Sequence, residues 1–207
     1  SNMSAELGAQ AGLVAPDETT RRYLRHAGAA EVHTGRWQSD PDAAAQWLDF
    51  DATVLEPQVA APHSPANAAP VRAYGDTPVQ VAYIGACTGA KLDDLRAAAQ
   101  VLQGRRVAAG VTLMVAPASQ RDQAAAQAEG VLPILLQAGA MLLPTSCGAC
   151  SGYGGSIPEG ANVIATTARN FKGRMGAATA QVYLASPYTV AASALAGRIA
   201  DPREILS

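Results

Sequence analysis

Three cysteines have the widest chemical repertoire in this sequence, because a thiolate can act as a nucleophile, a redox partner or a metal ligand. Cys87 lies in the segment Gly85-Ala86-Cys87-Thr88-Gly89, and the other two form the motif Cys147-Gly148-Ala149-Cys150. Glycines surround both segments. Glycine lets a backbone turn tightly around a bulky group and direct its N–H groups at sulfur or phosphate. Three cysteines in 207 residues exclude a framework of disulfide bonds.

Four interpretations of these cysteines are open. A redox-active pair usually opens a helix directly, but the glycine-rich segment after Cys150 makes a poor helix start. A structural zinc ion needs four ligands, and His26, His33 and His63 lack the spacing of a zinc finger. A single thiol is most often buried and unreactive. An iron–sulfur cluster held by only three thiolates keeps one iron with an open coordination position, which suits a Lewis acid.

A basic segment, Arg169-Asn170-Phe171-Lys172-Gly173-Arg174, is the second candidate for chemistry. Each of its two arginines can bind a carboxylate through two parallel hydrogen bonds. The alternative is a solvated surface loop, which is the usual role of a run of charge. Only 15% of the residues are charged, against about 25% in ordinary domains. A basic segment in such a chain therefore favours an anion-binding role.

The elements that must position these residues alternate between strands and helices. Short apolar runs predict buried parallel strands, and the helices between them carry apolar side chains at helical spacing. The expected strands are 79–84, 111–116, 141–143, 163–166 and 182–185, and the expected helices are 91–102, 119–129, 131–138 and 187–197. Carboxyl ends of parallel strands share one edge of a sheet. We therefore expect the cysteines and both arginines at that edge.

Three regions differ in composition. Residues 1–56 predict short helices, at 4–11, at 17–26 and after Pro41, the last of which is expected to bury Trp47 and Leu48. Residues 57–78 hold five prolines and predict an extended connector. Residues 79–207 form the expected α/β domain that carries the cysteines.

Composition excludes several functional classes. No run of about 18 apolar residues is present, so we expect no membrane-spanning helix. The net charge of −2 and pI near 5.9 argue against a nucleic-acid partner. The first residues lack the basic and apolar regions of a secretory signal, so a reducing, cytoplasmic setting is the expectation.

Taken together, these segments resemble the aconitase / 3-isopropylmalate dehydratase large-subunit family. Further matching pieces are Ser1-Asn2-Met3-Ser4-Ala5-Glu6 and Ala15-Pro16-Asp17-Glu18-Thr19, and order and spacing agree over almost the whole chain. The resemblance implies an aconitase-type, three-layer αβα domain with a mostly parallel sheet. It also implies a 4Fe–4S cluster held by Cys87, Cys147 and Cys150, with one iron that binds substrate.

The resemblance implies roles for four further residues. Asn2 and Glu6 would lie beside the cluster, with Glu6 able to handle the hydroxyl that leaves the substrate. Arg169 and Arg174 would bind carboxylates of the substrate. The implied enzyme is a hydro-lyase that dehydrates a 2-hydroxy di- or tricarboxylic acid and rehydrates it at the neighbouring carbon, with 3-isopropylmalate dehydratase as the nearest activity.

The chain also departs from the family pattern. It has about half the length of a family large subunit, and Ser1-Asn2-Met3 continues the pattern, so we expect the C-terminal half of a large subunit or one chain of a split enzyme. Such a chain would be inactive without an N-terminal half and a small subunit or swivelling domain that supplies the base. Gly89 and Ala168 replace asparagines common in the family, which leaves homoaconitate or 2-methylmalate as alternative substrates. A non-catalytic metal- or redox-binding remnant is the rival class.

Overall fold

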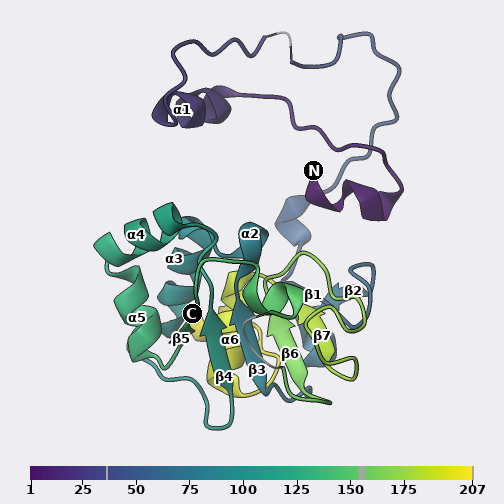
Figure 1. Ribbon diagram of the computed structural model, residues 1–207. Coiled ribbons are helices and arrows are strands. Elements are labelled where there is room, and N and C mark those ends of the chain that lie inside the picture. Colours follow the sequence, from purple (N-terminus) through teal and green to yellow (C-terminus); the bar gives the residue numbers. More distant parts are fainter. Residues whose placement is uncertain (36, 154–156, 207) are drawn as a thin grey trace. The chain divides into compact units, whose positions relative to one another are not determined.

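The computed structural model describes residues 1–35, 37–153 and 157–206. The chain divides into two units, Ser1–Leu55 and Glu56–Ser207, and each is described by itself (Figure 1). The first unit contains the 3-10 helix η1 (Asn2–Leu7), helix α1 (Glu18–His26) and the 3-10 helix η2 (Ala52–Val54). The second unit contains the sheet and all of the other named elements.

Helix α1 begins where the sequence predicts it, because the Asp17 side chain caps its first turn. The Asp17 carboxylate accepts a hydrogen bond of 2.9 Å from the Thr20 backbone N–H, and the Thr20 side chain completes the capping box. The prediction of a helix after Pro41 is wrong. Residues 41–50 have no helix, and Trp47 and Leu48 are 84% and 70% exposed. A helix this short needs a packing surface to be stable, and the unit supplies none to these side chains.

One seven-stranded sheet organises the described part of the second unit. Its strands are β1 (Gln58–Ala60), β2 (Ala68–Pro70), β3 (Val81–Ile84), β4 (Thr112–Val115), β5 (Met141–Leu142), β6 (Asn162–Ala165) and β7 (Gln181–Leu184). They lie in the order β2-β1-β7-β6-β3-β4-β5, and β7, β6, β3, β4 and β5 are parallel. The predicted α/β class with a mostly parallel sheet is confirmed.

Helices alternate with the parallel strands: two follow β3, two follow β4 and two follow β7. They are α2 (Ala86–Gly89), α3 (Leu92–Leu102), α4 (Gln120–Ala128), α5 (Val131–Gln137), α6 (Pro187–Ala196) and α7 (Arg203–Leu206). Ser119 and Ser186 cap α4 and α6, because each hydroxyl accepts a backbone N–H three residues further on. Strand and helix bounds from Val79 onward agree closely with the sequence-based expectations.

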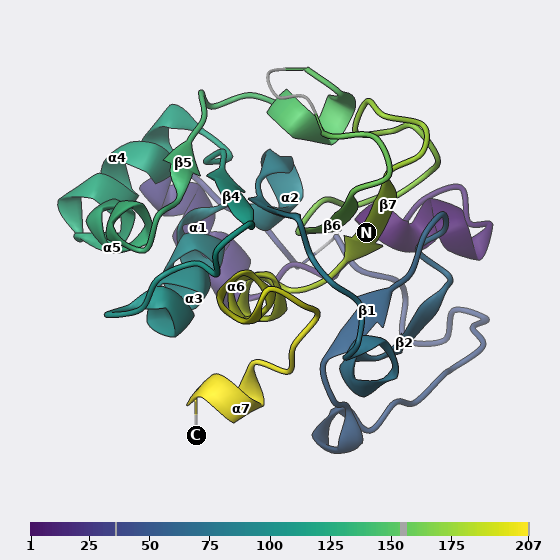
Figure 2. The same cartoon turned by 90° about the horizontal axis from the view of Figure 1, so that it is seen from below.

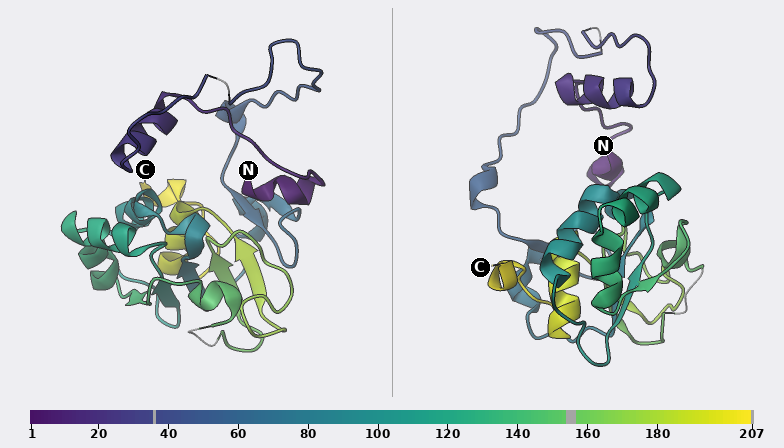
Figure 3. Two further views of the ribbon diagram at one scale, coloured as in Figure 1. Left: turned by 45° about the horizontal axis from the view of Figure 1, so that its top comes forward. Right: turned by 90° about the vertical axis from the view of Figure 1, so that its left-hand side faces the viewer.

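The two faces of the sheet carry separate apolar clusters. Ile84 and Leu113 face the larger cluster, which α3, α5 and α6 cover. Tyr83 and Met114 face the smaller cluster. The 3-10 helix η4 (Gly148–Ser151) and the loops around it cover that second face (Figure 2, green; Figure 3, right). The smaller cluster therefore joins the sheet directly to the segment that carries two of the cysteines.

The proline-rich segment 57–78, predicted as an extended connector, is part of the sheet. It belongs to the second unit and contributes β1, β2 and the 3-10 helix η3 (Val71–Tyr74). Strand β1 pairs antiparallel with β2 and with β7. Proline is compatible with this role because Pro70 lies at the end of β2, which is an edge strand. At such a position the sheet does not need the backbone N–H that proline lacks.

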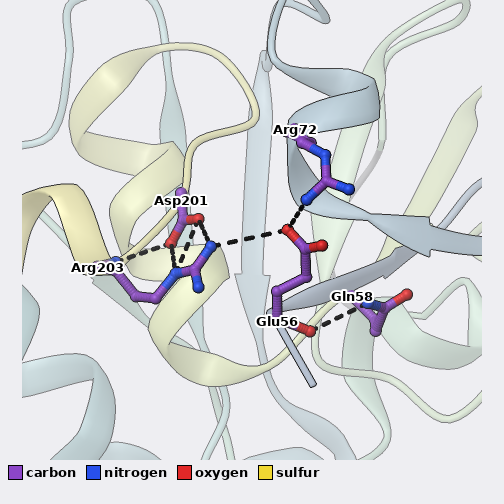
Figure 4. A network of polar contacts seen from close by, with 5 residues as sticks. All are labelled: Glu56, Gln58, Arg72, Asp201 and Arg203. Atoms are coloured by element: carbon purple, nitrogen blue, oxygen red, sulfur yellow. Dashed lines mark hydrogen bonds and ion pairs between the residues drawn. The ribbon is translucent and has the colours of Figure 1, made fainter. Parts of the chain in front are cut away.

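A polar network holds the C-terminal helix α7 to the start of the second unit (Figure 4). Arg203 bonds Asp201 at 2.6 Å and approaches Glu56 at 3.8 Å, and Arg72 pairs with the same Glu56 carboxylate. The hydrogen bonds from Arg203 lower the pKa of the Asp201 carboxyl below its usual value.

None of the helices in the described part of the chain has both the length and the apolar character that a membrane span requires.

Candidate functional site

The carboxyl edge of the parallel strands carries the candidate residues. Cys87 follows β3, the Cys147–Cys150 motif follows β5, and Arg169 and Arg174 follow β6. The chain runs from β3 through β4 to β5 on one side and then returns to place β6 on the other side of β3. Open α/β sheets bind ligands at the point where the strand order reverses in this way. Cys87 and the arginine segment therefore leave adjacent strands at the expected position of a ligand site.

The turn that carries Cys87 is fixed by Thr166 at the end of β6. The Thr166 hydroxyl accepts the Gly85 N–H at 3.0 Å and donates to the Gly85 carbonyl at 3.2 Å. Cys87 lies in the single-turn helix α2, and its side chain is exposed. A Cβ at Gly89, which ends this turn, would lie only 2.2 Å from the carbonyl oxygen of Thr166. The close contact excludes any side chain at position 89 in this backbone.

Substitution of Gly89 by alanine is expected to destabilise the fold by about 3 kcal/mol, the upper range for overpacking a rigid core. The matched control is Gly75→Ala, because the nearest atoms to its Cβ lie at 3.8 Å and its φ of −55° suits alanine. We expect that control to change the free energy of unfolding by less than about 0.5 kcal/mol. Urea denaturation of both variants measures the difference, and equal destabilisation would contradict the contact.

The Cys147–Cys150 motif forms the turn η4 against the smaller cluster. Cys147 is exposed, whereas Cys150 is 6% exposed among the apolar side chains. The phenol of Tyr83, which is fully buried on β3, donates a hydrogen bond of 3.2 Å to the Cys147 carbonyl. Burial raises the pKa of Tyr83 to about 12, and charge on Cys150 acts in the same direction. Hydrogen bonds with the backbone N–H groups of Cys150 and Ala86 lower the pKa and offset part of this rise. The phenol therefore stays protonated at neutral pH.

Arg174 joins the arginine segment to the cysteine motif. Its guanidinium NH2 lies 3.7 Å from the Cys150 sulfur and donates a hydrogen bond to it. Its Nε is buried and has no hydrogen-bond partner among the described residues. A buried donor without a partner is costly, so this N–H is suited to bind an anion. The backbones also meet here, because a Cβ at Gly152 would lie 3.3 Å from the Gly176 nitrogen.

Asn170 anchors the arginine segment, a role that the sequence analysis missed. Its side chain is fully buried and donates hydrogen bonds to the carbonyls of Ala61 at 2.8 Å and Val182 at 3.0 Å. It thereby fixes the segment to the chain beside β1 and to β7. Ala61 lies 109 residues away and Val182 lies 12 residues away, so no spacing within the segment identifies these acceptors. Arg169 itself is partly exposed, and its carbonyl accepts a bond of 3.2 Å from Thr167.

The structure brings some candidate residues together and leaves others apart. Cys150, Arg174 and the Tyr83 phenol are connected through η4. Among the described residues, no three histidine, cysteine, aspartate or glutamate side chains are grouped closely enough to hold a metal ion. Asn2 and Glu6 are exposed on η1 in the first unit. Their expected position beside a cluster stays a prediction.

Comparison with known proteins gives one consistent result. The sequence matches the aconitase family (aconitate hydratase) over residues 1–77 and 72–197. The chain is 44% identical to the 3-isopropylmalate dehydratase large subunit of Moorella thermoacetica and 42% identical to large subunit 1 of that enzyme from Pyrococcus furiosus. Each match covers 99% of this chain and 49% of the relative. The chain therefore spans about half the length of the curated relatives it matches.

Proposed function

The chain belongs to the aconitase family, and on that premise we propose that it is the cluster-binding half of an iron–sulfur hydro-lyase. The substrate would be a 2-hydroxy di- or tricarboxylic acid, as in 3-isopropylmalate dehydratase, the enzyme to which the relatives belong. The observation that carries the proposal is the Cys150–Arg174 pair, in which a buried thiol adjoins a guanidinium with an unpartnered N–H. This pair lies at the carboxyl edge of a parallel sheet, where such folds bind ligands.

The residues present suit a 4Fe–4S cluster with three protein ligands. Cys87, Cys147 and Cys150 supply three thiolates, the ligand type that holds such clusters. A cluster with inorganic sulfide is anionic, and the unpartnered N–H of Arg174 beside Cys150 suits an anion. Because the three thiols are not grouped, we propose that the Cys87 turn and η4 approach each other when the cluster binds. A reducing compartment, such as the cytoplasm, would keep these thiols available.

The chain's own residues would bind and orient the substrate. Arg169 and Arg174 would each hold a carboxylate by paired hydrogen bonds, which fixes the carbon that carries the hydroxyl. Asn2 and Glu6 would lie beside the departing hydroxyl. The cluster, when bound, supplies a Lewis acid for the loss of that hydroxyl. A base on a small subunit or swivelling domain would remove the proton from the neighbouring carbon, so that the two losses together make one water.

Exposed apolar side chains in the first unit support the need for a partner chain. Single exposed apolar residues are normal, but a large exposed apolar surface is typical of an interaction site. Six of those in the first unit are at least 75% exposed: Leu7, Leu13, Val14, Trp47, Phe50 and Val54. We propose that an N-terminal half, corresponding to the part of the relatives that this chain does not match, covers them.

The test is complementation. We expect the chain alone to give no turnover, because in the proposed enzyme the base and the N-terminal half come from outside this chain. Co-expression with a matching N-terminal half and a small subunit, followed by anaerobic loading with iron and sulfide, is expected to give hydratase activity. The assay uses isopropylmalate, homocitrate, citrate and 2-methylmalate. Turnover of none of them by the loaded assembly would overturn the proposal in favour of a non-catalytic metal- or redox-binding remnant.

A different acid is the second candidate within the same chemistry. Gly89 leaves no side chain beside Cys87 and is packed against Thr166, and Ala168 is small and partly exposed. Neither position offers a polar group to a substrate. Homoaconitate or 2-methylmalate is therefore included as an alternative substrate, and the preferred acid in the same assay decides between them.

A further inference from the structure

Tyr83 occupies an unusual place between the two loops that carry the cysteines. Its side chain is on the face of β3 that meets η4, and it is fully buried. The phenol donates to the Cys147 carbonyl at 3.2 Å. A Cβ at Gly148 would lie 3.5 Å from the same phenol oxygen. The tip of the ring therefore lies directly against the backbone of the Cys147–Cys150 motif.

The same ring tip also lies against the Cys87 turn. A Cβ at Gly85 would be 2.1 Å from Cζ and 2.3 Å from the oxygen of Tyr83. The φ of Gly85 is −170°, an extended value open to any residue, so the ring alone requires glycine there. Gly85 directly precedes α2, which contains Cys87. One side chain thus separates the backbones of both cysteine loops.

We propose that Tyr83 is a positioning residue that sets the spacing between the Cys87 turn and the Cys147–Cys150 motif. A phenylalanine would fill the same apolar volume without burying a hydroxyl, which costs free energy unless it is hydrogen-bonded. The hydroxyl instead makes a hydrogen bond that links β3 to Cys147, 64 residues further along the chain. Tyr83 sets this spacing in the cluster-free chain. The approach of the two loops on cluster binding rests on the proposed function, whereas the cluster-free spacing does not.

The two loops are held by different contacts, which makes the proposal specific. The Thr166 hydroxyl, just after β6, accepts the Gly85 N–H and donates to the Gly85 carbonyl, which fixes Gly85 there. The phenol donates to the Cys147 carbonyl and also contacts the Ala86 N–H of the Cys87 turn. Without the phenol, that turn still keeps its bonds to Thr166. Loss of the phenol hydroxyl should therefore loosen η4 and expose Cys150 while the Cys87 turn keeps its place. Cys87 and Cys147 are already exposed, so their labelling reports only local change. A general weakening of the core would instead raise Cys150 labelling in proportion to the loss of stability in urea.

Site-resolved alkylation of the cluster-free chain tests this. Tyr83→Phe is expected to raise the rate of iodoacetamide labelling at Cys150 about fivefold, the change in loop opening that one lost hydrogen bond corresponds to. Labelling of Cys87 should stay unchanged. The matched control is Tyr188→Phe, which removes a phenol bonded to Gln100 at 3.3 Å on the opposite face of the sheet. Equal labelling of Cys150 in Tyr83→Phe and in the unmodified chain would overturn the proposal.

A packing test uses Gly85. Gly85→Ala is expected to lower the melting temperature, because the buried ring of Tyr83 fills the space of the new methyl group. In a Tyr83→Leu background the ring tip is gone, and the same substitution should cause no further loss. An equal loss in both backgrounds would contradict the contact.

Cluster loading separates this proposal from the proposed function. If the unmodified chain holds no cluster but Tyr83→Phe still exposes Cys150, the spacing role stands and the iron–sulfur proposal fails. If the unmodified chain holds a cluster and Tyr83→Phe changes neither Cys150 labelling nor the rate of iron loss to a chelator, the spacing role fails and the iron–sulfur proposal stands.

Discussion

Replacement of Cys87, Cys147 or Cys150 by serine is expected to abolish binding of the cluster and, in the complemented enzyme, all hydratase activity. A serine hydroxyl stays protonated at neutral pH and does not replace a thiolate as a ligand for iron. Each variant is loaded anaerobically with iron and sulfide, and iron content, sulfide content and the electron paramagnetic resonance spectrum are measured. The control is Gln127→Ala, an exposed position on α4, which should load like the unmodified chain.

The four interpretations of the cysteines give different outcomes in this experiment. A structural zinc ion would appear as bound zinc before loading. A redox pair would form a Cys147–Cys150 disulfide that both serine variants in that motif prevent. Inert thiols would leave iron content equal in all variants, and that result would contradict the ligand assignment. Loss of the cluster in only the Cys147 and Cys150 variants would exclude Cys87 as a ligand.

Binding of one cluster by all three cysteines requires the cysteine loops to move. The described side chains include no preformed group of three metal-binding residues. Cys87 is exposed in the cluster-free structure. Loading should therefore protect Cys87 from alkylation, because the Cys87 turn must approach η4 to share the cluster. Unchanged labelling of Cys87 after full loading would show that this thiol binds no iron.

Much of the second unit could be predicted because its signals are local. Buried parallel strands appear as short apolar runs, and serine at 119 and 186 marks the start of a helix through a bond to a neighbouring N–H. Parallel strands then require that Cys87, Cys150 and Arg174 share one edge of the sheet. The general position of the site followed from this topology without any knowledge of side-chain contacts.

The remaining features depend on contacts between distant parts of the chain. Residues 57–78 were expected as a connector because prolines disfavour pairing, yet an edge strand tolerates them. Trp47 was expected in a buried helix face, and its segment has no surface to pack against within its unit. Tyr83 and Asn170 each act through carbonyls far along the chain. No spacing of residue types encodes such pairs.

Arg174→Lys is expected to lower kcat/KM of the complemented enzyme by about 10- to 100-fold. A hydrogen bond to a charged group contributes about 1.5–3 kcal/mol, and lysine does not reproduce the planar fork that binds a carboxylate. Arg174 is suited to this role because its Nε is buried, has no partner within the described chain and lies beside Cys150. Steady-state kinetics with the preferred acid measures the change, together with the dissociation constant of a substrate analogue.

The matched control is Lys172→Gln, which removes an exposed positive charge from the same segment. A role through general electrostatic attraction would lower kcat/KM similarly in both variants and would contradict a specific contact of Arg174. A purely structural role for Arg174 would lower the melting temperature and the cluster content along with activity. A specific carboxylate contact predicts weaker binding of the analogue at unchanged iron content, because lysine keeps a positive charge beside Cys150 and loses only the paired hydrogen bonds to the carboxylate.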